Sequence, residues 1–286
     1  MITLSNPQIE ARVSETGAEL QSLKSNGLEY IWQADPVFWG KHAPVLFPIV
    51  GELKGGKYLF EGNSYSLTRH GFARERTFYV ESQKDSEVVL ALHSDQATLE
   101  KYPFQFIFRV KFRIEIGKLF CTYSVENTQS QDIYFSVGGH PAFKVPLEDN
   151  LLYTDYALFF QNDDSLTRFL LEKGLTNDLT ETIELNQKTL PLSPSLFYKD
   201  AIVLKMLKSK EIKLFSQKGT HGLHFKFEGF PYFGIWAAKD APFVCLEPWC
   251  GIADNLDHDQ QLIHKEGIIN LKPGMHWERT WSVSLF

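Results

Sequence analysis

Glu247 is the carboxylate whose surroundings best suit proton transfer. It follows an apolar run, residues 241–246, that predicts a buried strand, and the proline at 248 should end that strand because it cannot donate to a ladder. Burial raises the pKa of a carboxyl group and suits it to acid or base catalysis. Trp249 adds a flat ring, and a carboxylate beside an aromatic face is what a sugar-binding site needs. The alternative for Glu247 is a structural ion pair with a lysine or arginine.

His140 is the histidine with the strongest local support. It lies in the segment VGGHPAF, residues 137–143, where two glycines allow close backbone approach and a proline restricts the chain afterwards. The ring should therefore be held in place. Since imidazole titrates near neutral pH, we predict a general acid. A hydrogen-bonded structural histidine in a turn is the alternative.

A second polar segment is RHGFAR, residues 69–74, which contains His70 and Arg74. Arg74 could bind a hydroxyl or a phosphate group through its planar guanidinium. From spacing alone, a turn with a surface salt bridge explains both residues equally well or better. Rigid strands commonly position such loops, and this is why the segment stays a candidate.

Other polar clusters give weaker signals, and we predict neither a metal site nor a cofactor. His221 and His224 would lie on opposite faces of a strand, which does not suit shared ligation. Cys245 and Cys250 are expected to serve packing, and the acidic loop 254–259 to be solvated. The motifs GxGxxG, the P-loop and GxSxG are missing, which argues against nucleotide, phosphoryl-transfer and serine-hydrolase chemistry.

The elements that must position these residues are strands. Residues 104–116 place seven apolar side chains on one face and, apart from Ile107, polar ones on the other, which predicts a long, half-buried antiparallel strand. Residues 276–285 alternate in the same way, whereas residues 164–175 fit a short helix or a strand equally well. Many short strands separated by turns predict an all-β fold, a large antiparallel β-sandwich formed by a single domain, residues 1–286. The polar stretch 161–192 is the best candidate for an excursion from it.

Composition excludes several classes of partner. The net charge of −6 over 286 residues argues against nucleic-acid binding and gives no reason to expect attraction to a membrane. Only three cysteines are present, and the N-terminal residues show neither a basic region nor a long apolar stretch. We therefore expect a cytoplasmic protein, monomeric or homodimeric, with a small-molecule substrate.

Seven motifs in order resemble the aldose 1-epimerase (galactose mutarotase-like) superfamily, and its LacX-type bacterial branch in particular. They extend over nearly the whole chain, and the ordered set is specific although no single motif is: ETGAELQSL, VLFPIVG, HGFAR, YPFQF, GGHPAF, DAIVL and CLEPWCGIAD.

This resemblance implies a galactose mutarotase-like sandwich that interconverts the α and β anomers of a free hexose without a cofactor. It implies Glu247 as the general base and His140 as the general acid. It also implies that His70 binds the sugar and that Asp200 holds sugar hydroxyls. Aromatic side chains that could stack on the sugar are Trp249, Phe72 and Trp39.

The resemblance leaves three alternatives. One is a hexose-6-phosphate 1-epimerase, because HGFAR also occurs in those enzymes, where arginines bind the phosphate. Many relatives have arginine where this chain has Glu52, and a carboxylate there would oppose an anion, which favours a neutral sugar. The others are a non-catalytic carbohydrate-binding or sensing protein, and a glycosidase. A glycosidase needs a second catalytic carboxylate that the sequence does not single out.

Overall fold

The computed structural model describes residues 1–286, and its regular secondary structure is mostly antiparallel strand. The predicted β-sandwich is confirmed. One large sheet has nine strands in the spatial order β18 (Thr189–Pro191), β15 (Tyr156–Phe160), β20 (Glu211–Ser216), β21 (Leu223–Lys226), β25 (His276–Leu285), β11 (Lys118–Asn127), β10 (Phe106–Glu115), β9 (Glu87–His93) and β8 (Tyr79–Lys84).

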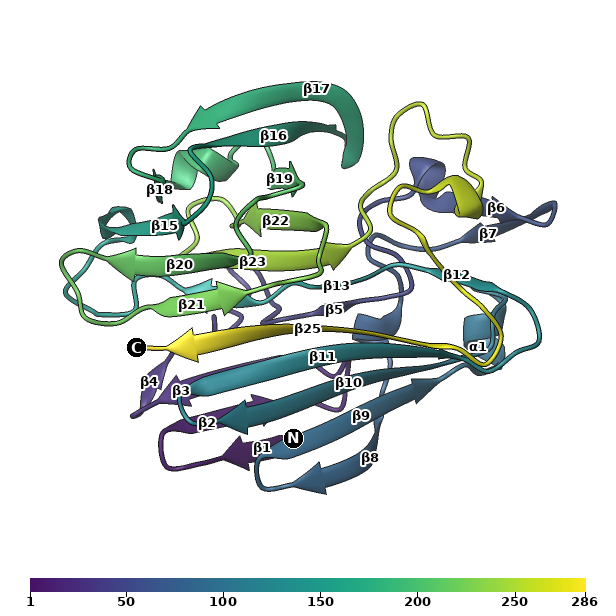
Figure 1. Cartoon of the computed structure of the whole chain (residues 1–286), viewed down its shortest axis with the longest axis horizontal. Coiled ribbons are helices and arrows are strands. Elements are labelled where there is room, and N and C mark those ends of the chain that lie inside the picture. Colours follow the sequence, from purple (N-terminus) through teal and green to yellow (C-terminus); the bar gives the residue numbers. More distant parts are fainter.

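The second large sheet carries the predicted site residues. Its strand order is β17 (Leu175–Glu184), β16 (Ser165–Glu172), β19 (Ile202–Lys205), β22 (Tyr232–Trp236), β23 (Phe243–Cys250), β13 (Val137–Gly139) and β5 (Val45–Leu46), and β14 (Ala142–Lys144) also pairs with β23. Figure 1 shows the long strands β25, β11, β10 and β9 of the nine-stranded sheet running side by side.

Smaller elements complete the chain. A four-stranded sheet near the N-terminus contains β1 (Ile2–Ser5), β2 (Ile9–Val13), β3 (Leu20–Ser25) and β4 (Leu28–Glu29). Two further strand pairs are β6 (Lys57–Phe60) with β7 (Asn63–Ser66), and β12 (Ile133–Phe135) with β24 (Ile269–Leu271). The α-helix α1 (Gln96–Leu99) is a single turn, so no helix could cross a bilayer.

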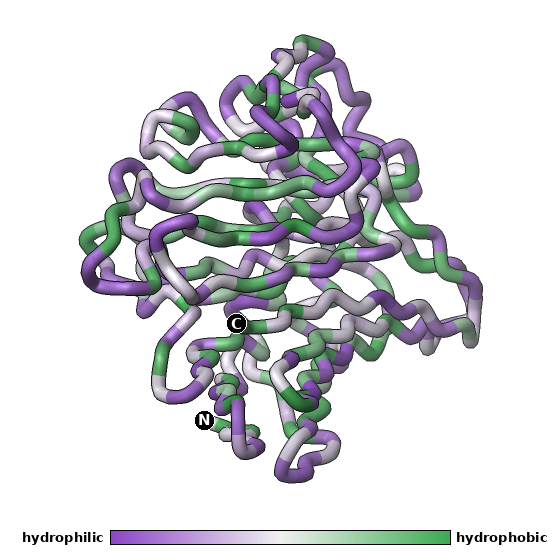
Figure 2. Tube along the Cα trace, turned by 60° about the vertical axis from the view of Figure 1, so that its left-hand side comes forward, coloured by the Kyte–Doolittle hydropathy of each residue, from purple (hydrophilic) through white to green (hydrophobic).

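Aromatic side chains fill the space between the two large sheets. The Phe108 ring of β10 stacks on Phe47, which directly follows β5, with ring centroids 4.3 Å apart. The Phe225 ring of β21 meets Phe233 of β22 edge to face at 6.0 Å. Offset and edge-to-face pairs of this kind add to the free energy gained from burial. Hydrophilic residues gather at the turns and hydrophobic residues in the strands (Figure 2).

The alternation predicted for residues 104–116 is confirmed. Side chains along β10 are buried at every second position, and their neighbours on the other face are half-buried or exposed. On that other face, Arg109 pairs with Glu81 at 2.7 Å and with Glu126 at 2.8 Å. Period-two patterning therefore located both the strand and its core face.

The expectation that a strand ends before Pro248 is wrong, because β23 continues to Cys250. Neighbouring residues in an antiparallel strand direct their N–H groups to opposite sides. Leu246 donates to the carbonyl of Pro141, so the nitrogen of Pro248 faces the same side. There the neighbouring edge is interrupted between β13 and β14. The missing N–H is tolerated at this break.

The ambiguous stretch and the polar excursion form one hairpin. Residues 164–175 contain strand β16 and not a helix, and β16 pairs with β17 from Ser165↔Glu184 to Glu172↔Leu175. The hairpin turn at Lys173 and Gly174 lies close to Arg69 and Glu52, since a Cβ added to Gly174 would be 2.2 Å from Arg69 Nη2. The excursion thus contributes to the site described next.

Candidate active site

The alternation of β23 places Cys245, Glu247 and Trp249 on one face of the sheet. Two glycines on the neighbouring strands leave room for the Trp249 indole. A Cβ added to Gly138 would lie 2.7 Å from the indole, and one added to Gly234 would lie 2.5 Å from it. Any larger residue at either position would displace Trp249.

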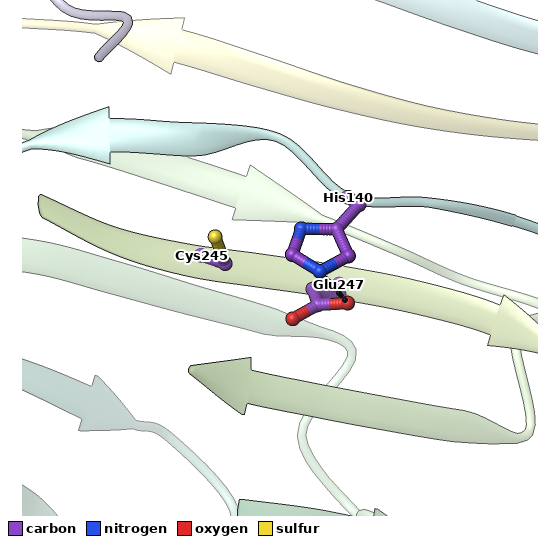
Figure 3. Close-up of side chains that lie close together, drawn as sticks. All are labelled: His140, Cys245 and Glu247. Carbon is purple, nitrogen blue, oxygen red and sulfur yellow. Dashed lines mark ion pairs between the residues drawn. The ribbon is translucent and has the colours of Figure 1, made fainter. Parts of the chain in front are cut away.

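His140 lies in the break between β13 and β14, directly across from Glu247. The pairs Gly138↔Trp249 and Ala142↔Cys245 keep one register on both sides of the break, so His140 is matched with Glu247. Its Nε2 atom is 3.2 Å from Oε2 of Glu247. Figure 3 shows the imidazole next to the carboxylate, with the Cys245 sulfur nearby. Two groups that are 107 residues apart in sequence thus meet through sheet register.

Aromatic rings hold the imidazole of His140 in place. Trp39 stacks on it with centroids 5.0 Å apart and an interplanar angle of 30°. Trp236 and His70 meet it edge to face, at 5.6 and 5.9 Å. The backbone N–H of His140 donates to the carbonyl of Pro44 at 3.1 Å. The predicted immobility of this ring is consistent with these contacts.

Burial shifts the pKa values of the pair in opposite directions. Side-chain exposure is only 11% for His140 and 2% for Glu247. Burial lowers the pKa of His140 to about 3, and the Arg74 cation acts in the same direction. Burial raises the pKa of Glu247 well above its ordinary value, and the Asp200 carboxylate adds to this effect. Both shifts favour the uncharged form of each group, that is, a proton on Glu247 beside a neutral His140.

His70 is fixed by the backbone of a neighbouring loop. The N–H of Gly51 donates to Nδ1 of His70 at 3.1 Å, and the N–H of His70 donates to the Gly51 carbonyl at 2.9 Å. Because Nδ1 accepts, the ring proton must be on Nε2. The φ angle of His70 is +67°, which is uncommon outside glycine and matches a strained position at a functional site.

A pocket of about 230 Å³ opens above this face of the sheet. Six of the predicted site residues line it: Glu247, His140, His70, Arg74, Asp200 and Trp249. The pocket brings together residues from four distant parts of the chain, and its walls combine aromatic rings with charged groups. This composition is typical of a small-molecule site.

Phe72 lies outside this pocket, contrary to its expected role in stacking. Its ring is buried in the core, against Phe47, Tyr102 and Phe106. The reason is local, because the N–H groups of Phe72 and Ala73 both donate to the Phe47 carbonyl and turn the chain inward. We assign Phe72 to packing.

Arg69, Arg74 and Glu52 form the charged end of the pocket. Arg69 Nε donates to Glu52 Oε2 at 2.9 Å, and Arg74 Nη2 donates to the Arg69 carbonyl at 2.8 Å. Burial lowers the pKa of Arg74, although the group remains a cation. Glu52 thus pairs with Arg69, whereas Arg74 lines the pocket with the mostly exposed Glu75 carboxylate 3.9 Å from its Nε atom.

Asp200 approaches the pocket on an unusual backbone. Its φ angle is +147°, and its Oδ1 accepts a hydrogen bond from the N–H of Ala201 at 2.7 Å. Arg168 of β16 donates to the Asp200 carbonyl at 2.8 Å and holds the turn. The second carboxylate oxygen has no protein partner within hydrogen-bond distance and is free for a ligand.

Several pocket residues were missed by sequence reasoning. They are Lys41, Leu171, Gly174, Val203 and Trp236. Trp236 reaches the pocket because its strand β22 pairs with β23, a pairing that the sequence does not show. Leu171 and Gly174 belong to residues 164–175, which fit a helix or a strand equally well in the sequence.

The donor atoms of His140, Cys245 and Glu247 lie within 4.8 Å of one another, and their types could in principle coordinate a metal. The other histidine candidates do not cluster, since His224 contacts Glu211 and His221 contacts the Phe286 carbonyl. Of the residues expected to be solvated, Asp254 is instead buried and pairs with Lys265 at 2.8 Å.

The sandwich architecture and its pocket place the chain among the galactose mutarotase-like β-sandwiches. The chain belongs to the aldose 1-epimerase family, whose sequence model matches residues 1–284. It is 34% identical over 285 residues to the chromosomal protein LacX of Lactococcus lactis subsp. lactis, and the match covers 95% of each chain.

Two solved structures are similar over the full length. A galactose mutarotase related enzyme from Lactobacillus acidophilus superposes with a TM-score of 0.95 at 34% identity, covering 100% of this chain and 97% of the other. A galactose mutarotase-like protein from Lactobacillus casei gives a TM-score of 0.92 at 31% identity, with both chains fully covered.

Proposed function

We propose that this protein is an aldose 1-epimerase that interconverts the α and β anomers of a free hexose. The observation that carries the proposal is the buried contact between His140 and Glu247 on the floor of the pocket. Both side chains can exchange protons, and the burial shifts favour a protonated Glu247 that can donate and a neutral His140 that can accept. Anomer exchange needs this combination.

The reaction follows from the position of that proton. Transfer from Glu247 to His140 across their 3.2 Å contact gives a carboxylate and an imidazolium. Glu247 then takes the proton of the C1 hydroxyl while His140 protonates the ring oxygen. The C1–O5 bond breaks and C1 becomes an aldehyde. After rotation about the C1–C2 bond the ring closes, with each group reversing its role, which leaves a carboxylate and an imidazolium. Return of the proton from His140 to Glu247 then restores the starting state.

The remaining pocket residues bind and orient the sugar. His70 donates from Nε2, and the free carboxylate oxygen of Asp200 accepts from a hydroxyl. Trp249 offers its indole face and a buried Nε1 that has no hydrogen-bond partner. Trp39 orients the His140 ring through stacking. Buried polar groups without partners favour a ligand that supplies them, as sugar hydroxyls would.

A neutral hexose fits the charged end better than a phosphorylated one, because Glu52 engages Arg69 and leaves a carboxylate at the wall. A hexose 6-phosphate is the second candidate, and Arg74 and Lys41 favour it, since both are cations at the pocket. The two candidates share the acid and base, and differ only in what the charged end binds.

Polarimetry tests the proposal directly. The decay of optical rotation of freshly dissolved α-D-glucose and α-D-galactose is followed with and without protein, and α-glucose 6-phosphate is followed with a coupled assay for one anomer. Acceleration with a free sugar supports the proposal, and acceleration with the phosphate alone supports the second candidate. No acceleration with any of the three contradicts both, and release of product from an aryl glycoside would indicate a glycosidase.

A further inference from the structure

A buried ion pair lies behind the wall of the pocket. The Lys265 ammonium donates to Asp254 Oδ1 at 2.8 Å and to the Ile252 carbonyl at 2.7 Å. Both side chains are completely shielded from solvent. Burial lowers the pKa of Lys265, and the Asp254 carboxylate partly offsets that shift. Neither residue lines the pocket, so the pair contacts no substrate.

Asp254 connects three segments that form the pocket wall. Its Oδ2 accepts from the N–H of Lys54 at 2.9 Å, and its own N–H donates to the Glu52 carbonyl at 2.9 Å. Its carbonyl accepts from the N–H of Thr176 at 2.9 Å, two residues after Gly174. Residues 51–53 and 251–254 belong to no strand, so no ladder sets their position. The Asp254–Lys265 pair and the hydrogen bonds of Asp254 hold these segments in place instead.

A short path leads from this pair to His70. Gly51 has a φ angle of +78°, and a Cβ added to it would lie 2.4 Å from the Ala253 backbone. The two segments are therefore in close backbone contact beside Asp254. Gly51 in turn exchanges two hydrogen bonds with His70, one of them to Nδ1. A displacement of Asp254 would therefore shift the tightly packed Gly51, and with it the hydrogen-bonded imidazole of His70.

Stability alone does not account for this arrangement. A buried ion pair seldom stabilises a fold more than well-packed apolar residues of the same volume do, because both ions lose their hydration. Its best-supported use is to fix one geometry among several. The positive charge of Lys265 also helps to lower the pKa of His70, after burial and the nearer cations.

We propose that Lys265, acting through Asp254 and Gly51, is a positioning residue that holds His70 as its Nε2–H tautomer and directs that donor into the pocket. The benefit to catalysis rests on the function proposed above. The effect on the imidazole itself does not, so the two can fail separately.

Imidazole ¹⁵N NMR tests the effect on His70. Its signals are assigned by their loss in His70→Gln. In the wild-type protein we expect an unprotonated Nδ1 and a protonated Nε2. In Lys265→Met we expect these shifts to move toward an average of the two tautomers. Since that variant buries Asp254 without its lysine partner, with only His258 at 3.5 Å and the Lys54 N–H beside it, Asp254→Asn/Lys265→Met provides a second test that does not depend on the first variant folding. Lys272→Met removes an exposed pair with Asp132 and is the matched control. Unchanged His70 shifts in a folded variant would overturn the proposal.

Kinetics provides the second readout. We expect Lys265→Met or the double variant to raise KM for the hexose by roughly tenfold and to leave kcat within about twofold. In a His70→Gln background the same substitution should add almost nothing, because the path ends at that ring. Effects that add fully in the two backgrounds would mean that Lys265 does not act through His70. If no sugar is turned over, the NMR result still decides the positioning role.

Discussion

Two groups of three adjacent strands, one in each large sheet, bury different kinds of side chain. Around β10, β11 and β25 the buried face is apolar, and charged groups on the other face are paired, as Arg109 is with Glu81 and Glu126. Around β13, β23 and β22 the pocket face buries an imidazole, a carboxylate and an indole N–H. Buried polar atoms without partners occur at six residues, and none of the six lies in the nine-stranded sheet.

This difference indicates a division of labour within the sandwich. A buried polar group without a partner costs free energy, whereas a buried apolar side chain contributes it. The nine-stranded sheet therefore stabilises the fold, and the pocket sheet holds His140, Glu247 and Trp249, whose unpartnered buried atoms line the pocket. Substitutions in the two regions should accordingly separate activity from stability.

The largest effect should come from Glu247→Gln, which keeps the shape of the side chain but removes its proton chemistry. We expect kcat for anomer exchange to fall by ~10²–10⁴-fold, the usual contribution of a positioned acid or base. The fold should persist, since the amide replaces a carboxyl group that is neutral when buried. Polarimetry measures the rate and circular dichroism the fold. Near-normal rates in the variant would remove Glu247 from the mechanism.

The opposite outcome is expected for Phe112→Ala on β10. Phe112 is fully buried, so its truncation should lower the free energy of unfolding by ~3–5 kcal/mol through lost burial and a cavity. The activity of the folded fraction should stay within about twofold, because the site lies on the other sheet. Urea unfolding and polarimetry at low temperature measure the two quantities. A large loss of kcat in the folded protein would show that the sheets are not independent.

The nine-stranded sheet could be predicted from the sequence more completely than the pocket sheet. Period two in residues 104–116 identifies the face of a strand, and the structure confirms it. The same period cannot identify a partner strand. The match of His140 with Glu247 depends on a register that runs across a break, which is a long-range property.

The particular misses have the same origin. Pro248 was expected to end its strand, because the interrupted edge that tolerates it is not visible in the sequence. Phe72 was expected to stack on the sugar, yet the turn there directs the neighbouring side chains of Phe72 and Ala73 to the core. Asp254 was expected in solvent, since its partner Lys265 lies eleven residues away across an irregular loop.

An effect of intermediate size is expected in the pH dependence of the free energy of unfolding, which should differ between the wild type and Glu247→Gln. The folded-state pKa of Glu247 is raised above its ordinary value of 4.5, so unfolding releases a proton at higher pH. Stability should therefore be lost as pH rises from 4.5 toward the raised pKa, by up to ~1.4 kcal/mol per pH unit. Glu247→Gln removes this loss. Urea unfolding of both proteins between about pH 4 and about pH 8 should show that the variant gains stability relative to the wild type as pH rises. Parallel curves would show an ordinary pKa for Glu247.

The smallest effect is expected for the same substitution on the other sheet, Glu126→Gln. Glu126 is partly exposed, and Arg109 keeps its second partner Glu81, so the free energy of unfolding should fall by less than ~1 kcal/mol. Salt should reduce even that loss, because exposed charges are screened. Urea unfolding at low and high ionic strength measures it. Near neutral pH the two Glu→Gln variants should thus change stability with opposite signs. An equal loss of unfolding free energy in both variants would mean that the two carboxylates contribute to stability in the same way. The distinction between a stabilising sheet and a reactive sheet would then be wrong.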